Sequence, residues 1–288
     1  MIDINNIKSI IKFKRQLISE LPYAPNNKES DNYLLSLDIG DIVHIYDFWQ
    51  QKLIHSQPRK TVVSGKVRNS HFYINNKEKI KALLSRINNG LDVNGYLSHK
   101  AHNAVFEVEK FKQNRSFNSF RDQILICEGF HHLHLEEFPK RTNEVLIAHV
   151  TSNTFEVVQV ANHDLFENNA AAFAEYNKHI DDFLLSKNPN GGVFIGGAGG
   201  GMQNLAGSSI YSTFKQIHIR KILQNVEIAN GGIENYVKNI YLNIHNRTLQ
   251  YIDPEWRMLG NEIVIYDKKN KNEFEGANLL HRYANTNG

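Results

Sequence analysis

Residues 129–163 read GFHHLHLEEFPKRTNEVLIAHVTSNTFEVVQVANH, and this stretch decides the fold that the sequence predicts. It holds three short segments rich in β-branched and apolar residues, each bounded by turn-forming residues, which is typical of β-strands. Thr151-Ser152-Asn153-Thr154 separates the second segment from the third and has the composition of a tight turn. We therefore expect an antiparallel hairpin, preceded by a histidine-rich strand.

Segments on both sides of these strands have helical spacing. The clearest is Lys77 to Asn88 (KEKIKALLSRIN), and the sequence Asn-Asn-Gly marks its C-terminal end. Residues 3–21 carry apolar residues three and four positions apart, and residues 166–185 return to that pattern. The sequence thus predicts an α+β protein with a central, mainly antiparallel sheet flanked by helices and elaborated at its N- and C-terminal ends.

Three segments are expected along the chain. Residues 1–75 form an N-terminal helical or mixed segment, and residues 76–187 form the α+β core with the histidine strand. Residues 188–288 hold a glycine-rich loop, helices and a terminal hairpin.

Strand-like and basic segments also occur outside the core. DIVHIYDFW (41–49) has the composition of a strand, and the terminal hairpin would join TLQYID (248–253) to EIVIYD (262–267). PRKTVVSGKVR (58–68) carries four basic residues in eleven, which fits either a solvated edge or a phosphate-contacting edge.

Bulk composition excludes several classes of protein. The chain has 288 residues, 41% hydrophobic and 22% charged, and its net charge of +3 permits a nucleic-acid partner without requiring one. The single cysteine, Cys127, excludes an intramolecular disulfide and any zinc site built on paired cysteines. Because there is no apolar run of about 18 residues and no signal-peptide-like N-terminus, we expect no membrane association and a cytoplasmic location.

The histidine strand carries the most distinctive side chains. Side chains alternate between the two faces of a strand, so His132 and His134 project together, whereas His131 shares the face of Leu133 and Leu135. The leucines form the natural core side. Two imidazoles, which titrate near neutral pH, would then lie on one open face.

Four interpretations of this face are open. The histidines could act as general acid and base on a phosphodiester. His132 and His134 could instead ligate a metal such as zinc or manganese, with His163, Glu136 or Glu137 completing the set. The face could bind an anionic partner without chemistry, or its histidines could make ordinary hydrogen bonds only.

His163 ends the last strand, where active-site residues often gather. Strict alternation along that strand would place one set of side chains on one face and the remaining set on the other. The first set is Phe155, Val157, Gln159, Ala161 and His163, and the second is Glu156, Val158, Val160 and Asn162.

Further candidates lie near the strands. His99 and His102 in YLSHKAH are three residues apart, so they would share one helical face and could contact a metal or RNA phosphates. The glycine run at 188–201 holds seven glycines in fourteen residues, and it fits neither G-x-G-x-x-G nor the P-loop spacing. It is therefore either an anion-binding loop or a mobile lid or partner loop.

The order of these elements resembles the core of RelE/ParE-type toxins. From about Lys77 to Glu167 the chain has two expected helices, then the strand segments FHHLHLEE and NEVLIAHV, a turn, the strand segment TFEVVQVANHDLFE and another helix. HLHL falls where the first strand of those toxins has alternating basic residues, LIAHV matches the middle strand, and VVQVANHDLFE matches the last. The chain departs from the pattern where His149 and Asp164 stand in place of the usual arginines.

The resemblance implies a metal-independent endoribonuclease that needs no cofactor and acts in a toxin–antitoxin or phage-defence setting. RNA would be its substrate, and a protein antitoxin or regulator would be its partner. The catalytic residues would be His132, His134 and His163, and the substrate-binding candidates would be Lys140, Arg141, His131, His99 and His102. Two alternatives stay open: a hydrolase or nuclease that binds a divalent metal through the same three histidines, and a non-enzymatic module that binds nucleic acid or protein.

Overall fold

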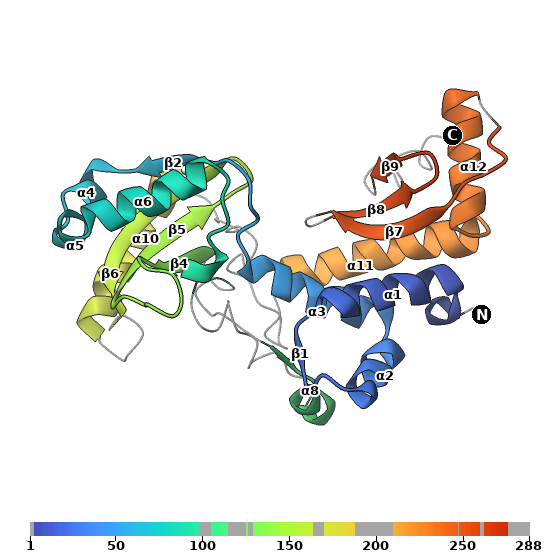
Figure 1. Ribbon diagram of the computed structural model, residues 1–288, viewed down its shortest axis with the longest axis horizontal. Coiled ribbons are helices and arrows are strands. Elements are labelled where there is room, and N and C mark those ends of the chain that lie inside the picture. The colour runs from blue at the N-terminus through green and yellow to red at the C-terminus, as the bar shows by residue number, and fades with distance from the viewer. Residues whose placement is uncertain are drawn as a thin grey trace. The chain divides into compact units, whose positions relative to one another are not determined.

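The computed structural model describes residues 3–97, 105–114, 125, 129–163, 170–187, 210–246, 248–259 and 262–275. The chain forms two compact units that interleave along the sequence (Figure 1). The first unit combines Met1–Gln50, Val105–Ser116 and Ser212–Gly288, so it draws on both ends of the chain. The second unit combines Gln51–Ala104 and Phe117–Tyr211, and it contains the histidine strand.

The second unit is built on a four-stranded sheet with the order β2-β6-β5-β4 (Figure 1). Its strands are β2 (Lys60–Val63), β4 (Phe130–His134), β5 (Glu144–Val150) and β6 (Thr154–Asn162). The pairs β4–β5 and β5–β6 are antiparallel, as the sequence predicts, whereas β2 pairs with β6 in parallel. The α+β class is confirmed, whereas the sequence pattern did not indicate the parallel edge strand.

The predicted β5–β6 hairpin is confirmed at its turn. The backbone N–H of Thr151 donates to the carbonyl oxygen of Thr154 at 2.9 Å, and the hydroxyl groups of the same two residues lie 2.8 Å apart. The side-chain oxygen of Thr151 also accepts the Thr154 N–H, so the turn is held by side chain and backbone together.

A β-bulge interrupts the hairpin and changes which side chains face each other. Ile147 lies opposite Gln159 but Ala148 lies opposite Val157, so Val158 is an extra residue in β6. The predicted strict alternation along this strand is therefore wrong. Val157 and Val160 belong to the same buried cluster, because the bulge shifts the alternation by one residue.

Helices cover both faces of the sheet. On one face Leu133, Leu146 and Val160 pack in the cluster that contains Leu83 of α6 (Lys77–Asn88), which begins and ends where the sequence predicts. The other face packs Phe130, Ile147 and Ala161 against Tyr176 and Ile180 of α10 (Ala170–Lys187). Burying these side chains contributes about 1.5–3 kcal/mol each. The shorter elements of the unit are α4 (Gly65–Arg68), α5 (His71–Asn75) and η2 (Asn94–Tyr96).

The first unit combines helices with two small sheets (Figure 1). Strands β1 and β3 pair in parallel, and β7, β8 and β9 form an antiparallel sheet. The helices are η1 (Ile4–Asn6), α1 (Lys8–Glu20), α2 (Lys28–Ser36), α3 (Ile39–Lys52), α8 (Val108–Asn114), α11 (Ile210–Gln224), the π-helical turn η5 (Asn225–Ala229) and α12 (Ile233–His245). The strands are β1 (Tyr23–Ala24), β3 (Phe106–Glu107), β7 (Pro254–Leu259), β8 (Glu262–Asp267) and β9 (Asn272–Glu275).

Buried polar contacts tie distant parts of the first unit together. Glu227 accepts hydrogen bonds at 2.6 Å from the Ser9 hydroxyl of α1 and from the Trp256 indole N–H of β7. Lys215 of α11 forms an ion pair with Asp47 of α3, and both side chains are nearly inaccessible. Because each of these buried polar groups has a partner, the contacts join the two ends of the chain without leaving any of them unpaired.

Two strand predictions in this unit are wrong. DIVHIYDFW lies in α3, whose Ile42, Val43 and Ile45 are all buried; an apolar run that is buried on several sides does not distinguish a helix from a strand. The terminal sheet uses Pro254–Leu259, not 248–253, as the partner of β8. Proline is tolerated there because it is the first residue of its strand.

Several expectations fall on residues outside the described ranges. They concern His99, His102, Cys127 and the glycine run at 188–201. Among the helices that the structure describes, none has the length and apolar character needed to cross a membrane.

Candidate functional site

The histidines of β4 divide between the two faces of the sheet. Leu133 and Leu135 belong to the cluster on the α6 side, whereas Phe130 belongs to the cluster on the α10 side. Strand alternation therefore places His132 and His134 on the α10 side, with exposed fractions of 9% and 4%. His131 lies on the α6 side and is partly exposed, so the structure does not bring it to the other two.

His134 meets His163 above the middle strand. The two imidazole rings are stacked, with centroids 5.6 Å apart and planes 17° apart. Val145 of β5 and Ala161 of β6 occupy the row beside His134, and their short side chains leave room for the two rings to approach. The β-bulge makes this contact possible, because uninterrupted alternation from Phe155 would have put His163 on the opposite face.

A backbone contact fixes the tautomer of His134. Its Nδ1 lies 2.8 Å from the carbonyl oxygen of Thr142, and a carbonyl can only accept, so Nδ1 carries the hydrogen. In the neutral ring, Nε2 is then the basic nitrogen. Nε2 is buried and has no hydrogen-bond partner among the residues that the structure describes.

The surroundings of His134 favour its neutral form. Burial lowers its pKa below the ordinary value, and the nearby charges of Arg141, His163 and His132 lower it further. The hydrogen bond to Thr142 acts in the opposite direction but does not outweigh burial. His134 is therefore an unprotonated imidazole near neutral pH, as a general base must be.

Thr142 also fixes the connection between β4 and β5. Its hydroxyl accepts the N–H of Leu135 at 2.9 Å and donates to the carbonyl oxygen of Glu144 at 2.7 Å. The backbone N–H of His163 donates to Asn143 at 2.6 Å, which holds the end of β6 beside the same connection. The positions of His134 and His163 are thus set by one short stretch of backbone.

Arg141 supplies the positive charge of this region. Its Nε and one terminal nitrogen, Nη2, are buried without a hydrogen-bond partner in the described part of the chain. Burial lowers its pKa, but a guanidinium stays charged at any physiological pH. An arginine with free donors beside an imidazole with a free acceptor can bind a phosphate next to a hydroxyl group.

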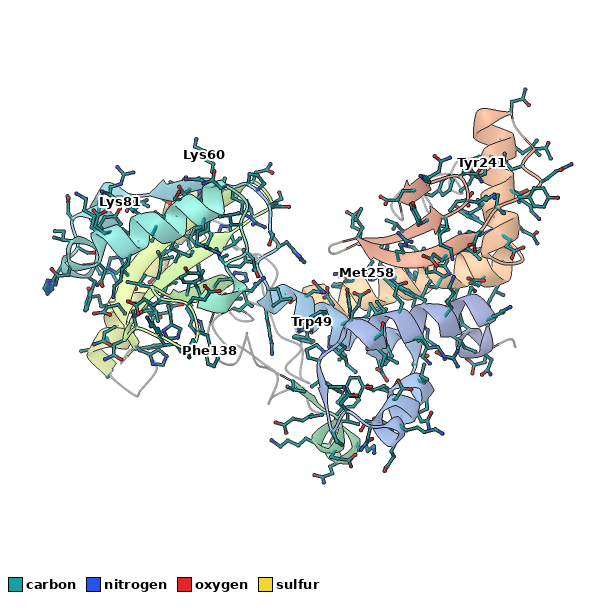
Figure 2. The ribbon with its side chains drawn as sticks, viewed as in Figure 1. Trp49, Lys60, Lys81, Phe138, Tyr241 and Met258 are labelled. Carbon is teal, nitrogen blue, oxygen red and sulfur yellow. The ribbon has the colours of Figure 1, made fainter. Side chains whose placement is uncertain are left out.

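An aromatic side chain adjoins Arg141 on the same connection. The Arg141 guanidinium carbon lies 5.6 Å from the centroid of the Phe138 ring, and 46% of Phe138 is exposed. Lys140 is also exposed here. Figure 2 shows Phe138 on the β4 side of the second unit and Lys60 on the β2 side.

The alternative metal set is not assembled. Within the described ranges, no three histidine, cysteine or carboxylate side chains lie where they could hold one metal ion. Glu136 forms an ion pair with Lys79 at 2.7 Å, and Nδ1 of His134 is already bonded to Thr142. This geometry gives no support to the ligand set His132, His134 and His163.

Other histidine and basic candidates have structural roles. His149 packs beside Phe130 and Phe183, with ring centroids 6.0 and 5.5 Å away, and burial lowers its pKa. Arg59, in the basic run at 58–68, donates to the carbonyl oxygens of Thr151 and His55, so it serves the fold and not a phosphate.

Three residues near the pair escape sequence reasoning. Thr142 contacts His134 through its backbone carbonyl group, which every residue type has. Gln159 lies in the same row as His132, with Ile147 between them, and its buried Oε1 has no partner in the described residues. Phe138 lies two positions before Lys140-Arg141, and aromatic and basic side chains occur together in proteins that bind single-stranded nucleic acid, so the sequence carries a signal for it that is not specific.

No protein-family model matches the chain, and neither the curated proteins nor the solved structures gave a significant match.

Proposed function

We propose that the second unit is a metal-independent endoribonuclease whose acid/base pair is His134 and His163. One observation carries the proposal: in the described part of the chain, Nε2 of His134 and the Nε and Nη2 donors of Arg141 are buried without hydrogen-bond partners, and the charge of Arg141 reaches His134. Buried polar atoms are almost always hydrogen-bonded, so an unpaired acceptor and unpaired donors in one region of the unit point to a ligand with complementary groups. A ribose 2′-hydroxyl next to a phosphodiester has both.

The proton transfers of this reaction balance within the pair. Nε2 of His134 takes the proton of the 2′-hydroxyl, whose oxygen then forms a bond to phosphorus. The bond from phosphorus to the 5′-oxygen breaks, and the protonated form of His163 gives that oxygen its proton. The products are a 2′,3′-cyclic phosphate and a free 5′-hydroxyl, and the two imidazoles regain their starting states by proton exchange with water.

Neighbouring side chains have supporting roles in this proposal. Arg141 neutralises the charge that builds on the phosphate oxygens, and the exposed Lys140 attracts the RNA backbone. Burial keeps the pKa of His134 low, and His132 adds a smaller contribution in the same direction. The biological setting of the proposal is that of a cytoplasmic toxin or phage-defence effector, restrained by a protein antitoxin or regulator.

The test is incubation of the purified protein with RNA in excess chelator. We expect cleavage products that end in a 2′,3′-cyclic phosphate, and no cleavage of DNA of the same sequence, because DNA lacks the 2′-hydroxyl. His134→Ala, purified in parallel, shows whether a contaminating ribonuclease is responsible. Intact RNA after prolonged incubation with the wild-type protein would refute the proposal.

Binding without turnover is the other informative result. RNA that binds in a salt-sensitive manner but stays intact would assign the chain to the non-enzymatic alternative. Cleavage that chelator abolishes and zinc or manganese restores would assign it to the metal-dependent alternative.

A further inference from the structure

Phe138 packs beside Arg141, and the acid/base mechanism proposed above uses Arg141 but not Phe138. Phe138 is a large apolar residue in the β4–β5 connection, and 46% of it is exposed to solvent. Its position is fixed, because its backbone N–H donates to the carbonyl oxygen of Gly95 at 3.0 Å. About half of the Phe138 side chain is therefore open to solvent on a connection whose backbone is held in place, and a ring in that position can stack on a ligand.

Arg141 connects this ring to the acid/base pair. The guanidinium lies beside the Phe138 ring at 5.6 Å, and its charge also lowers the pKa of His134. Thr142, the next residue, bonds His134 directly at 2.8 Å. A phosphate held by Arg141 would thus lie near both His134 and Phe138.

We propose that Phe138 is a stacking platform for a nucleobase next to the bound phosphate, and that the site therefore takes unpaired RNA. Every nucleobase has a π-face, so an exposed ring beside a cation binds bases with little regard to sequence. A base in a double helix is already stacked on both sides and cannot reach the ring. This inference rests on the proposed function for the identity of the ligand.

The site should bind unpaired RNA whether or not it cleaves it, so binding is measured with an oligonucleotide that cannot react. Fully 2′-O-methylated single-stranded RNA lacks the attacking hydroxyl, and its affinity can be followed by fluorescence anisotropy. The proteins compared are the wild type, Phe138→Ala, Phe138→Trp and Phe173→Ala. Phe173 is a matched control in the same unit, since it is 50% exposed on α10.

We expect Phe138→Ala to weaken binding about tenfold, the loss of one stacked base. Phe138→Trp should keep the affinity, and its indole fluorescence should be quenched when the oligonucleotide is added. Phe173→Ala should bind like the wild type, and binding of a duplex of the same sequence should not change in Phe138→Ala. All variants should unfold at the wild-type temperature, because both rings are exposed.

Three results would overturn the inference: wild-type affinity in Phe138→Ala, an equal loss in Phe173→Ala, or no binding of the single strand by the wild type. The two proposals fail separately. A Phe138-dependent affinity in a protein that leaves unmodified RNA intact keeps the platform and refutes the ribonuclease. RNA cleavage whose KM is the same in Phe138→Ala keeps the ribonuclease and refutes the platform.

Discussion

His134 and His163 are stacked on the α10 face of the second unit, with ring centroids 5.6 Å apart, although His134 lies on β4, His163 follows β6, and these two strands are not neighbours in the sheet. The two rings differ in their surroundings. His134 is 4% exposed and bonded to the backbone of Thr142, whereas His163 lies at the partly exposed end of β6. Two titratable groups held close together in different environments are the arrangement that acid/base catalysis needs.

Replacing Thr142 by valine should loosen the position of His134 without changing the shape of residue 142. The hydroxyl loses its bonds to Leu135 and Glu144, which should lower the free energy of unfolding by about 1–3 kcal/mol. Urea denaturation measures the change. Thr142→Ser should stay near the wild type, and so should Thr61→Val in β2, at the other edge of the sheet. A wild-type midpoint in Thr142→Val would show that the hydroxyl does not fix this connection.

The charge of Arg141 should be visible in the titration of His134. Burial and then the neighbouring charges lower the pKa of His134, so the ring should titrate below its ordinary value of 6.5. Arg141→Met removes one of these charges, and the pKa should move upward. Two-dimensional NMR of the His134 imidazole ring measures its titration in the wild type and in Arg141→Met. The same spectra show whether Nδ1 carries the hydrogen. A His134 pKa above 6.5 in the wild type would contradict the account.

Gln159 should be replaceable by methionine at no cost in stability. Its Oε1 is buried without a hydrogen-bond partner among the described residues, and an apolar side chain of similar shape removes that penalty. We expect Gln159→Met to leave the free energy of unfolding unchanged or to raise it by about 1 kcal/mol. Gln57→Met is the matched contrast, because the Gln57 amide donates to Ser152 at 2.5 Å and its loss should destabilise. A clear destabilisation in Gln159→Met would mean that Oε1 has a partner in the folded protein.

The first unit should lose stability in acid through Glu255. Burial opposes ionisation of this carboxylate, but its ion pairs with Lys12 and Arg257 outweigh burial and lower its pKa to about 2. Because the folded pKa is depressed, the contribution is complete above the unfolded value of 4.5 and is lost as the pH falls toward 2. The side chains of Lys12 and Arg257 are 55% and 38% exposed. Solvent screening therefore reduces the contribution of Glu255 to the free energy of unfolding to about 1–2 kcal/mol.

Glu255→Gln should therefore flatten the dependence of unfolding free energy on pH between about 4.5 and 2. Chemical denaturation at a series of pH values measures it. A slope in this window that equals that of the wild type would show that Glu255 is not the group that titrates.

Local periodicity accounts for what the sequence predicted correctly. Helix α6 has a clean apolar stripe and a clear stop, and the β5–β6 turn has residues with strong turn preferences. The common face of His132 and His134 follows from alternation within one short strand, where no irregularity intervenes.

Long-range and irregular features account for the errors. The bulge at Val158 has no residue signature, yet it moves Gln159 and His163 to the other face of the sheet. The parallel pairing of β2 with β6 depends on a segment that lies far from β6 in the sequence. In the same way, Glu227 joins residues from both ends of the chain, so no local pattern could have shown that these ends form one unit.

The most direct test of the acid/base pair is the rate of RNA cleavage by His134→Ala, His163→Ala and the double variant. Each single variant should lower kcat by about 10²–10⁴-fold, since each removes one proton transfer. The double variant should be little slower than the worse single one, because residues that act as a unit are not additive. His71→Ala, an exposed histidine on α5, should cleave at the wild-type rate. Wild-type kcat in either single variant would contradict the account.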